Sequence, residues 1–141
     1  MTKYLLDTNV ISELRKGERA DSRVQDWASA KDPESFYLSA ITLFEIAAGA
    51  NHLRGKGNEG GARVFETWIS AVLIPKFGER LLVITPNICL VAAHMLDTKG
   101  PPSPDLLIAA TAKAHGCTLV TRNVKDFTRF TLAIENPFEP A

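Results

Sequence analysis

Short apolar runs alternate along the chain with longer stretches in which apolar side chains recur every three or four residues. The short runs lie at residues 4–6, 36–38, 81–84, 117–121 and 132–134. Each is almost continuously apolar, which predicts a strand buried on both faces of a sheet. The helical spacing predicts helices around residues 10–16, 24–31, 39–53, 61–76, 86–95 and 105–115. This alternation favours one α/β domain over residues 1–141, with a mostly parallel sheet of four to five strands between helical layers.

Four glycines between residues 55 and 61 interrupt the helical pattern and predict the tip of a protruding helical hairpin with arms over 40–53 and 61–76. Four apolar positions of the first arm are available for burial: Ile41, Phe44, Ile46 and Ala47. Four of the second arm could serve the core or an interface, and for most we expect the core: Phe65, Trp68, Ile69 and Val72. The segment Gly100–Pro104 predicts a rigid loop.

The composition is that of an ordinary globular domain, with 45% apolar and 23% charged residues. It excludes a disordered, charge-rich chain. Lys plus Arg and Asp plus Glu each number 16, so a formal net charge of zero gives no argument for nucleic-acid binding. Cys89 and Cys117 are expected to be reduced, buried thiols. Neither a signal peptide nor a long apolar run is recognisable, so we expect a cytoplasmic protein without a membrane span.

Acidic side chains follow several of the predicted strands. Asp7 comes directly after the first run, and Glu45 lies one helical turn beyond residues 39–42, which follow the second. Asp105 stands at the start of a later helix, and Asn123 and Asp126 follow the fourth run. Ligands of parallel sheets bind outside the carboxyl ends of the strands. We therefore expect these side chains to meet at one end of the sheet.

Carboxylates that converge in a cleft repel one another, and a divalent cation removes that repulsion. Oxygen ligands from Asp, Glu and Asn suit Mg²⁺ or Mn²⁺. The three histidines, His52, His94 and His115, have no metal-ligand spacing, which argues against zinc. A metal in such a site is suited to phosphoryl chemistry, because it activates a water and stabilises charge on the leaving oxygen.

Each acid also has an ordinary structural explanation. Asp7 could close an Asx turn, and Glu45 could complete a capping box that begins at Thr42. Asp105 could complement the dipole at the start of its helix, after a capping Ser103–Pro104, and Asp126 could cap a short turn. Acids at three strand ends or helix starts are harder to assign to capping alone, and the combination favours a site.

Five segments resemble the motifs of one family. Residues 5–14 (LLDTNVISEL) resemble the opening motif of PIN-domain ribonucleases, especially the VapC and FitB-like toxins. Residues 42–49 resemble the second motif, 105–112 the third and 121–127 the fourth. Residues 134–138 look like the closing strand of the family. The resemblance spans residues 3 to 138, with all motifs in order at ordinary spacing.

The resemblance implies a three-layer α/β/α fold and a Mg²⁺-dependent endoribonuclease, with Mn²⁺ as a substitute. Such an enzyme cuts structured RNA, commonly tRNA or rRNA, by a metal-activated water and leaves a 3′-hydroxyl and a 5′-phosphate. The resemblance also implies a toxin with a cognate antitoxin, a homodimer, and a larger complex with the antitoxin that reaches operator DNA only through it. Dimer and antitoxin contacts are expected on the helical hairpin.

Carried over by position, Asp7, Glu45 and Asp105 match the metal-binding acids of the family. Many relatives have an acid where this chain has Asn123, and Asp126 lies three residues further on. Whether Asn123 or Asp126 fills the fourth acidic position stays open, as does the choice between one and two metal ions.

Polar neighbours of the acids have expected roles as well. Thr8, Asn9 and Thr121 are candidates for orienting the carboxylates by hydrogen bonds. We hypothesise that Arg122 and Lys125 contact RNA phosphates, although both could be ordinary solvated charges. If metal ions neutralise the four acids, the remaining charge of the chain is mildly basic, so overall neutrality does not exclude an RNA substrate.

Three other classes compete. A haloacid-dehalogenase type phosphatase needs a second Asp two residues after the first, and that position is Asn9. A response-regulator receiver needs an acidic pair near the first strand, where only Asp7 stands. The third class is a catalytically weak RNA- or partner-binding module on the same fold. Loss of an acid would favour it, but Asp7, Glu45 and Asp105 are all present.

Overall fold

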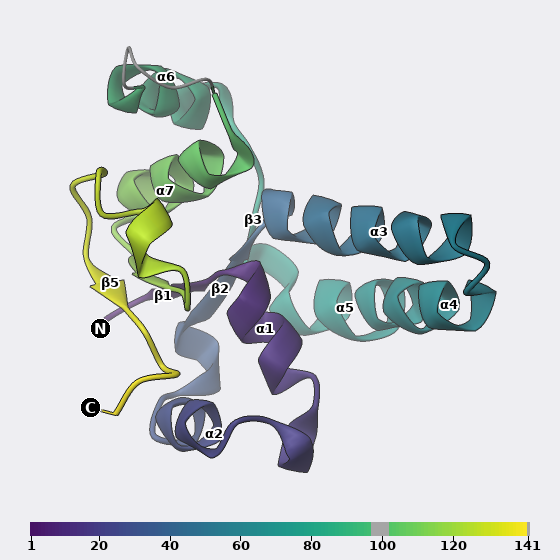
Figure 1. Cartoon of the computed structure of the whole chain (residues 1–141). Helices are drawn as coiled ribbons and strands as arrows, with labels where there is room; N and C mark the ends of the chain where they lie inside the picture. Colours follow the sequence, from purple (N-terminus) through teal and green to yellow (C-terminus); the bar gives the residue numbers. More distant parts are fainter. Residues whose placement is uncertain (97–101, 141) are drawn as a thin grey trace.

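The structure is a computed structural model that describes residues 1–96 and 102–140 (Figure 1). The described part of the chain contains a parallel sheet of five strands in the order β3-β2-β1-β4-β5. The strands are β1 (Tyr4–Leu6), β2 (Phe36–Ser39), β3 (Leu81–Leu82), β4 (Thr118–Val120) and β5 (Ile134–Glu135). All pairings are parallel, as the continuously apolar runs predicted.

Helices cover both faces of the sheet. They are α1 (Thr8–Leu14), α2 (Ser22–Ser29), α3 (Ala40–Gly55), α4 (Glu59–Trp68), α5 (Ile74–Phe77), α6 (Pro86–Met95) and α7 (Pro104–His115). α6 and α7 lie on one side of the sheet, and α1 and α2 lie on the other (Figure 1). The side chains of β1 alternate between two cores, because Leu5 packs with α6 and α7 whereas Leu6 packs with α1 and α2. The predicted three-layer α/β/α fold is confirmed.

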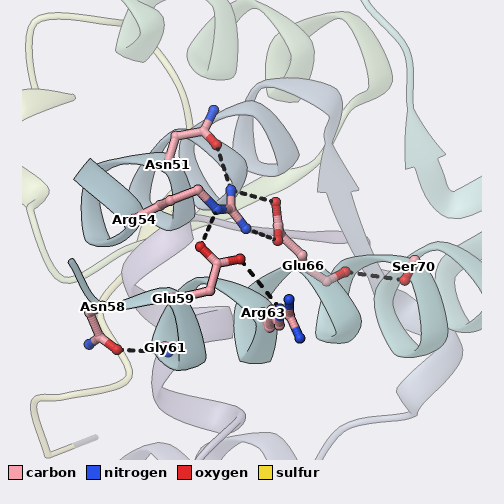
Figure 2. Close-up of polar contacts among 8 residues, drawn as sticks. All are labelled: Asn51, Arg54, Asn58, Glu59, Gly61, Arg63, Glu66 and Ser70. Atoms are coloured by element: carbon pink, nitrogen blue, oxygen red, sulfur yellow. Dashed lines mark hydrogen bonds and ion pairs between the residues drawn. The ribbon is translucent and has the colours of Figure 1, made fainter. Parts of the chain in front are cut away.

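The predicted helical hairpin is present. α3 and α4 form its arms and project away from the sheet, and a π-helical turn, Ile69–Leu73, joins α4 to α5 (Figure 1). At the tip, Gly57 has φ +83°, a conformation that glycine adopts without steric cost. Close to it, the Arg54 guanidinium bridges Glu59 and Glu66 of the opposite arm (Figure 2). These exposed ion pairs hold the two arms together but add little stability.

Several burial predictions are wrong. Phe44 and Ala47 on α3 and Val72 in the π turn are exposed, because no further layer covers the outer face of the projecting hairpin. Phe65, Trp68 and Ile69 are half-buried and pack against the core on the α1 side, as expected for most of these positions. Cys117 is buried, but Cys89 is exposed on α6, which corrects the expectation of two buried thiols.

Two further findings concern loops and membranes. Of the predicted loop Gly100–Pro104, residues 100 and 101 lie outside the described residues, and Ser103 caps α7. Among the residues described, none of the helices has both the length and the apolar character that a membrane span needs.

Candidate functional site

The candidate site begins where β1 and β4 end side by side. Leu6 is paired with Val120 in the parallel register, so Asp7 and Thr121 follow neighbouring strands at the same edge of the sheet. The Asp7 N–H donates to the Val120 carbonyl over 2.9 Å and continues the ladder by one residue. The Thr121 hydroxyl, itself fully buried, donates to Asp7 Oδ2 over 2.8 Å. The strand pairing therefore fixes the position of the first acid.

Asp7 also begins α1. As N-cap of that helix it accepts at Oδ1 from the Thr8 N–H over 2.8 Å, while the Asn9 side chain donates to Oδ2 over 3.2 Å. Asn9 Oδ1 in turn accepts from the Arg122 N–H over 3.0 Å, which ties the loop after β4 to α1. The Asx turn offered for Asp7 is wrong, because its carboxylate accepts from the N–H of the next residue, Thr8, and caps α1 instead. The same contacts orient its carboxylate, which is only 5% exposed.

Glu45 reaches this site from α3. Its Oε1 accepts from the Thr8 hydroxyl over 2.8 Å, and Thr8 also contacts the buried Thr42 hydroxyl at 3.4 Å. The predicted capping box is wrong, because Ser39 is the N-cap of α3 and accepts from the Ile41 N–H over 3.1 Å. Glu45 lies inside the helix, so its carboxylate is free to point across to α1.

Asp105 is in the first turn of α7. Ser103 caps that helix by accepting from the Leu106 N–H over 3.3 Å, and Pro104 is its first residue, as predicted. Asp105 is half-buried beside the acid cluster. Asp126 is the last residue of a short 3₁₀ turn, Val124–Asp126, whose N-cap is Asn123, so its predicted capping role is wrong.

The charges of the acids raise the pKa of their neighbours in the cluster. Burial raises the pKa of Asp7, hydrogen bonds from Thr121, Thr8 and Asn9 oppose that rise, and the charge of Asp126 adds to it. Burial is also the largest cause that raises the pKa of Glu45, and the charges of Asp7 and Asp105 follow. The four carboxyl groups are therefore close enough for their charges to disfavour one another.

The charge of Asp105 has little compensation. Burial raises its pKa first, the charges of Asp7 and Asp126 raise it further, and only the nearby Arg129 lowers it. Among the described contacts, its carboxylate accepts no hydrogen bond that would offset the repulsion. A cation that binds between Asp7 and Asp105 would relieve this repulsion.

The donor set fits a hard divalent cation. Its members are carboxylate oxygens with hydroxyl and amide neighbours, which suits Mg²⁺ or Mn²⁺. In residues 1–96 and 102–140, no group of three His, Cys, Asp or Glu side chains is close enough to hold an ion together. Mg²⁺ usually uses one or two carboxylates of the protein and keeps several waters.

The two candidates for the fourth acidic position differ in their surroundings. The Asn123 N–H donates to the Thr121 hydroxyl over 3.0 Å, while the residue itself is exposed. Asp126 is exposed as well, but its charge reaches both Asp7 and Asp105. The charge of Asp126 thus acts on the acids, and the backbone of Asn123 supports Thr121.

Basic side chains border the acids. Arg122 and Lys125 are exposed, and the Arg122 guanidinium stacks 4.9 Å from the ring centre of Phe138. Arg129, which follows in the same loop, stacks 4.7 Å from the Phe130 ring centre, and its charge lowers the pKa of Asp105.

Thr42 was recognised in the sequence only as a possible cap, and its contact with Thr8 depends on the approach of α3 to α1.

Comparisons with known proteins identify the class. The PIN domain family model matches residues 4–131, and the chain belongs to that family. It is 36% identical to the "VapC ribonuclease Y4jK" of Sinorhizobium fredii, covering 97% of this chain and 99% of that protein. It is 34% identical to the "Toxin FitB" of Neisseria gonorrhoeae, covering 95% and 97% of the two chains.

Solved structures agree with this assignment. The structure "FitAcB from Neisseria gonorrhoeae" superposes with a TM-score of 0.82 at 32% identity and covers 97% of this chain and 99% of that one. "VapBC-1 from nontypeable Haemophilus influenzae" superposes with a TM-score of 0.64 at 30% identity and covers 98% of this chain and all of the other. The resemblance inferred from the motifs is confirmed.

Proposed function

We propose that the chain is a metal-dependent endoribonuclease and the toxin of a type II toxin–antitoxin pair. The observation that carries the proposal is the group of carboxyl groups, Asp7, Glu45, Asp105 and Asp126, whose charges act on one another at the carboxyl edge of the sheet. Relatives named as VapC ribonucleases and as the FitB toxin support the same activity.

Asp7 and Asp105 would hold Mg²⁺ or Mn²⁺, assisted by Glu45 and by the region around Asn123 and Asp126. Such a cation supplies electrostatic stabilisation of the phosphate oxygens and activation of the attacking water. Thr8, Asn9 and Thr121 keep the carboxylates in position through the hydrogen bonds described above.

Positive charge beside the acids would hold the substrate. We assign the contact with RNA phosphates to Arg122 and Lys125, which are both exposed next to the site. The proposed substrate is structured RNA, tRNA or rRNA, and the products carry a 3′-hydroxyl and a 5′-phosphate.

The metal requirement is tested with total RNA. Purified protein should cut RNA with Mg²⁺ or Mn²⁺ and lose detectable cleavage with EDTA. The clustered carboxylates repel a phosphate unless a cation is bound to them. The new RNA ends should carry a 5′-phosphate, so a ligase that requires a 5′-phosphate should join them to an adaptor. Cleavage that persists in EDTA would contradict the metal-dependent mechanism. No cleavage under any metal would favour the non-catalytic binding module instead.

An antitoxin is the proposed protein partner. Similar solved structures include "FitAB bound to IR36 DNA fragment" and a "Toxin-antitoxin complex from Klebsiella pneumoniae". We propose that this chain likewise forms a heteromer with a cognate antitoxin that blocks the acid cluster, and that it reaches operator DNA only through that partner.

The proposed homodimer has a candidate surface. An apolar groove of about 560 Å³ lies between α3, α6 and the start of α7, with Phe44 and Leu107 among its lining residues. Phe44 is 64% exposed on it, and Leu90 nearby on α6 is 65% exposed. A two-fold axis would bring the same apolar patch of a second copy onto this one.

Phe44→Asp should convert the dimer to a monomer in sedimentation velocity, while the melting temperature changes little because Phe44 makes few contacts within the chain. Val64→Asp is the matched control, because Val64 is an exposed apolar residue of the other hairpin arm, outside the groove. A wild-type monomer, or a Phe44→Asp variant that stays dimeric, would contradict the assignment.

A further inference from the structure

A small cavity opens beside the acid cluster, between α1, α3 and α4. Its volume is about 200 Å³, and it is lined by Thr8, Ser12, Glu45, Ile46, Gly49 and Phe65. Thr8 and Glu45 are the two residues joined by the 2.8 Å hydrogen bond of the candidate site. The cavity therefore shares two of its lining residues with the candidate site.

Gly49 is an unusual residue in this wall. It lies inside the sixteen-residue helix α3, where glycine is less favourable than alanine. A Cβ built on Gly49 would meet no heavy atom within 4 Å among the described residues. Its backbone dihedrals are ordinary for a helix, since its φ is not positive. Neither close packing nor backbone geometry within this chain therefore requires a glycine here, and the space it leaves belongs to the cavity.

The lining has the chemistry of a base-binding site. Phe65 supplies an aromatic ring, and the Arg15 guanidinium stacks 4.7 Å from the centre of that ring. Ser12 adds a hydroxyl and Glu45 a carboxylate that can accept hydrogen bonds from an amino group. A carboxylate in the wall disfavours a phosphate, whereas unstacked RNA bases are bound by aromatic side chains and by hydrogen bonds to their edges.

We propose that this cavity holds one unstacked nucleobase of the RNA strand, next to the phosphate that is cut. The proposal rests on the ribonuclease function proposed above. A volume of about 200 Å³ equals roughly seven water molecules and is smaller than the pockets that take drug-sized ligands. Because Glu45 borders both the cavity and the acid cluster, a strand whose phosphate lies at the acids places its neighbouring nucleoside at the cavity.

Gly49→Leu tests the proposal by filling the cavity from the helix itself. Leucine is a good helix former, so the variant should fold and melt at least as high as the wild type. Gly55→Leu is the matched control, because Gly55 lies in the same helix with equally open space but outside the cavity. The substrate is a short RNA oligonucleotide that copies the strongest cleavage site of the wild type in total RNA.

The decisive comparison uses the same oligonucleotide with single abasic nucleotides on either side of the cut. For the wild type and Gly55→Leu, one abasic position should lower kcat/KM roughly 5- to 150-fold, the range found for a base stacked on an aromatic side chain. For Gly49→Leu, the intact oligonucleotide should be cut slower by a similar factor, and the abasic change should add no further loss. A general disturbance of the site would leave the abasic penalty in place.

Three results would overturn the proposal. One is a wild type that is indifferent to abasic nucleotides on both sides of the cut. Another is a Gly49→Leu variant that keeps the full abasic penalty. The third is a Gly49→Leu variant that cuts like the wild type but resists its cognate antitoxin, since the cavity would then serve a protein side chain. If the wild type cuts no RNA with any metal, the ribonuclease function fails first and the base site with it.

Discussion

Asp7→Asn is expected to lower RNA cleavage by at least about 10³-fold. The carboxylate of Asp7 is the most buried of the acid cluster and is held by Thr8, Asn9 and Thr121. An amide in its place removes the charge that binds a cation, and it turns one hydrogen-bond acceptor into a donor. Since electrostatic stabilisation by a metal is worth several kcal/mol, and about 1.4 kcal/mol corresponds to tenfold in rate, a loss of this size follows.

The measurement is cleavage of total RNA in Mg²⁺, with melting temperature recorded for each variant. Asp26→Asn makes the same chemical change at an exposed acid on α2, outside the acid cluster, and should cleave like the wild type. An Asp7→Asn variant that remains folded and cuts RNA within tenfold of the wild type would remove Asp7 from the mechanism.

The sheet and the first acid were predictable from local sequence. Continuous apolar runs such as residues 36–38 indicate strands covered on both faces, and the carboxyl end of such a strand is where polar groups meet. Asp7 follows its strand directly, so one position along the chain was enough to place it. The third and fifth strands are shorter than predicted, because β3 and β5 are edge strands and Val83 is already exposed.

Contacts between residues that lie far apart in the sequence were not predictable in the same way. Ser39 and Thr42 are both able to cap a helix, and only the structure shows that Ser39 does so and leaves Glu45 to bond Thr8. The exposure of Phe44 depends on a hairpin that leaves the sheet, which no periodicity within α3 indicates. Gly49 stood in the sequence only as the last residue of the second motif, and the cavity beside it depends on the approach of α1 and α4 to α3.

Asp105→Asn is expected to lower cleavage by about 10²- to 10³-fold and, without metal, to raise the free energy of unfolding at pH 7. The raised pKa of Asp105 means that its ionised form is disfavoured in the folded protein by burial and by Asp7 and Asp126. The loss of a favourable charge in the first turn of α7 opposes this gain. We expect the repulsion to outweigh it, because the carboxylate accepts no hydrogen bond among the described contacts.

The sign of the pH dependence distinguishes this cause from improved helix packing. When the pKa of an acid is higher in the folded protein than in the unfolded chain, the fold is most stable at a pH below the unfolded pKa, where the acid is protonated. This stability is lost as the pH rises through the folded pKa. The stability advantage of Asp105→Asn over the wild type, from urea unfolding in EDTA, should therefore be large at pH 7.5 and shrink towards pH 4. Added Mn²⁺ should stabilise the wild type and not the variant, which reverses their order. An advantage independent of pH would show that charge repulsion is not its cause, and equal stabilisation of both proteins by Mn²⁺ would show that Asp105 does not hold the cation.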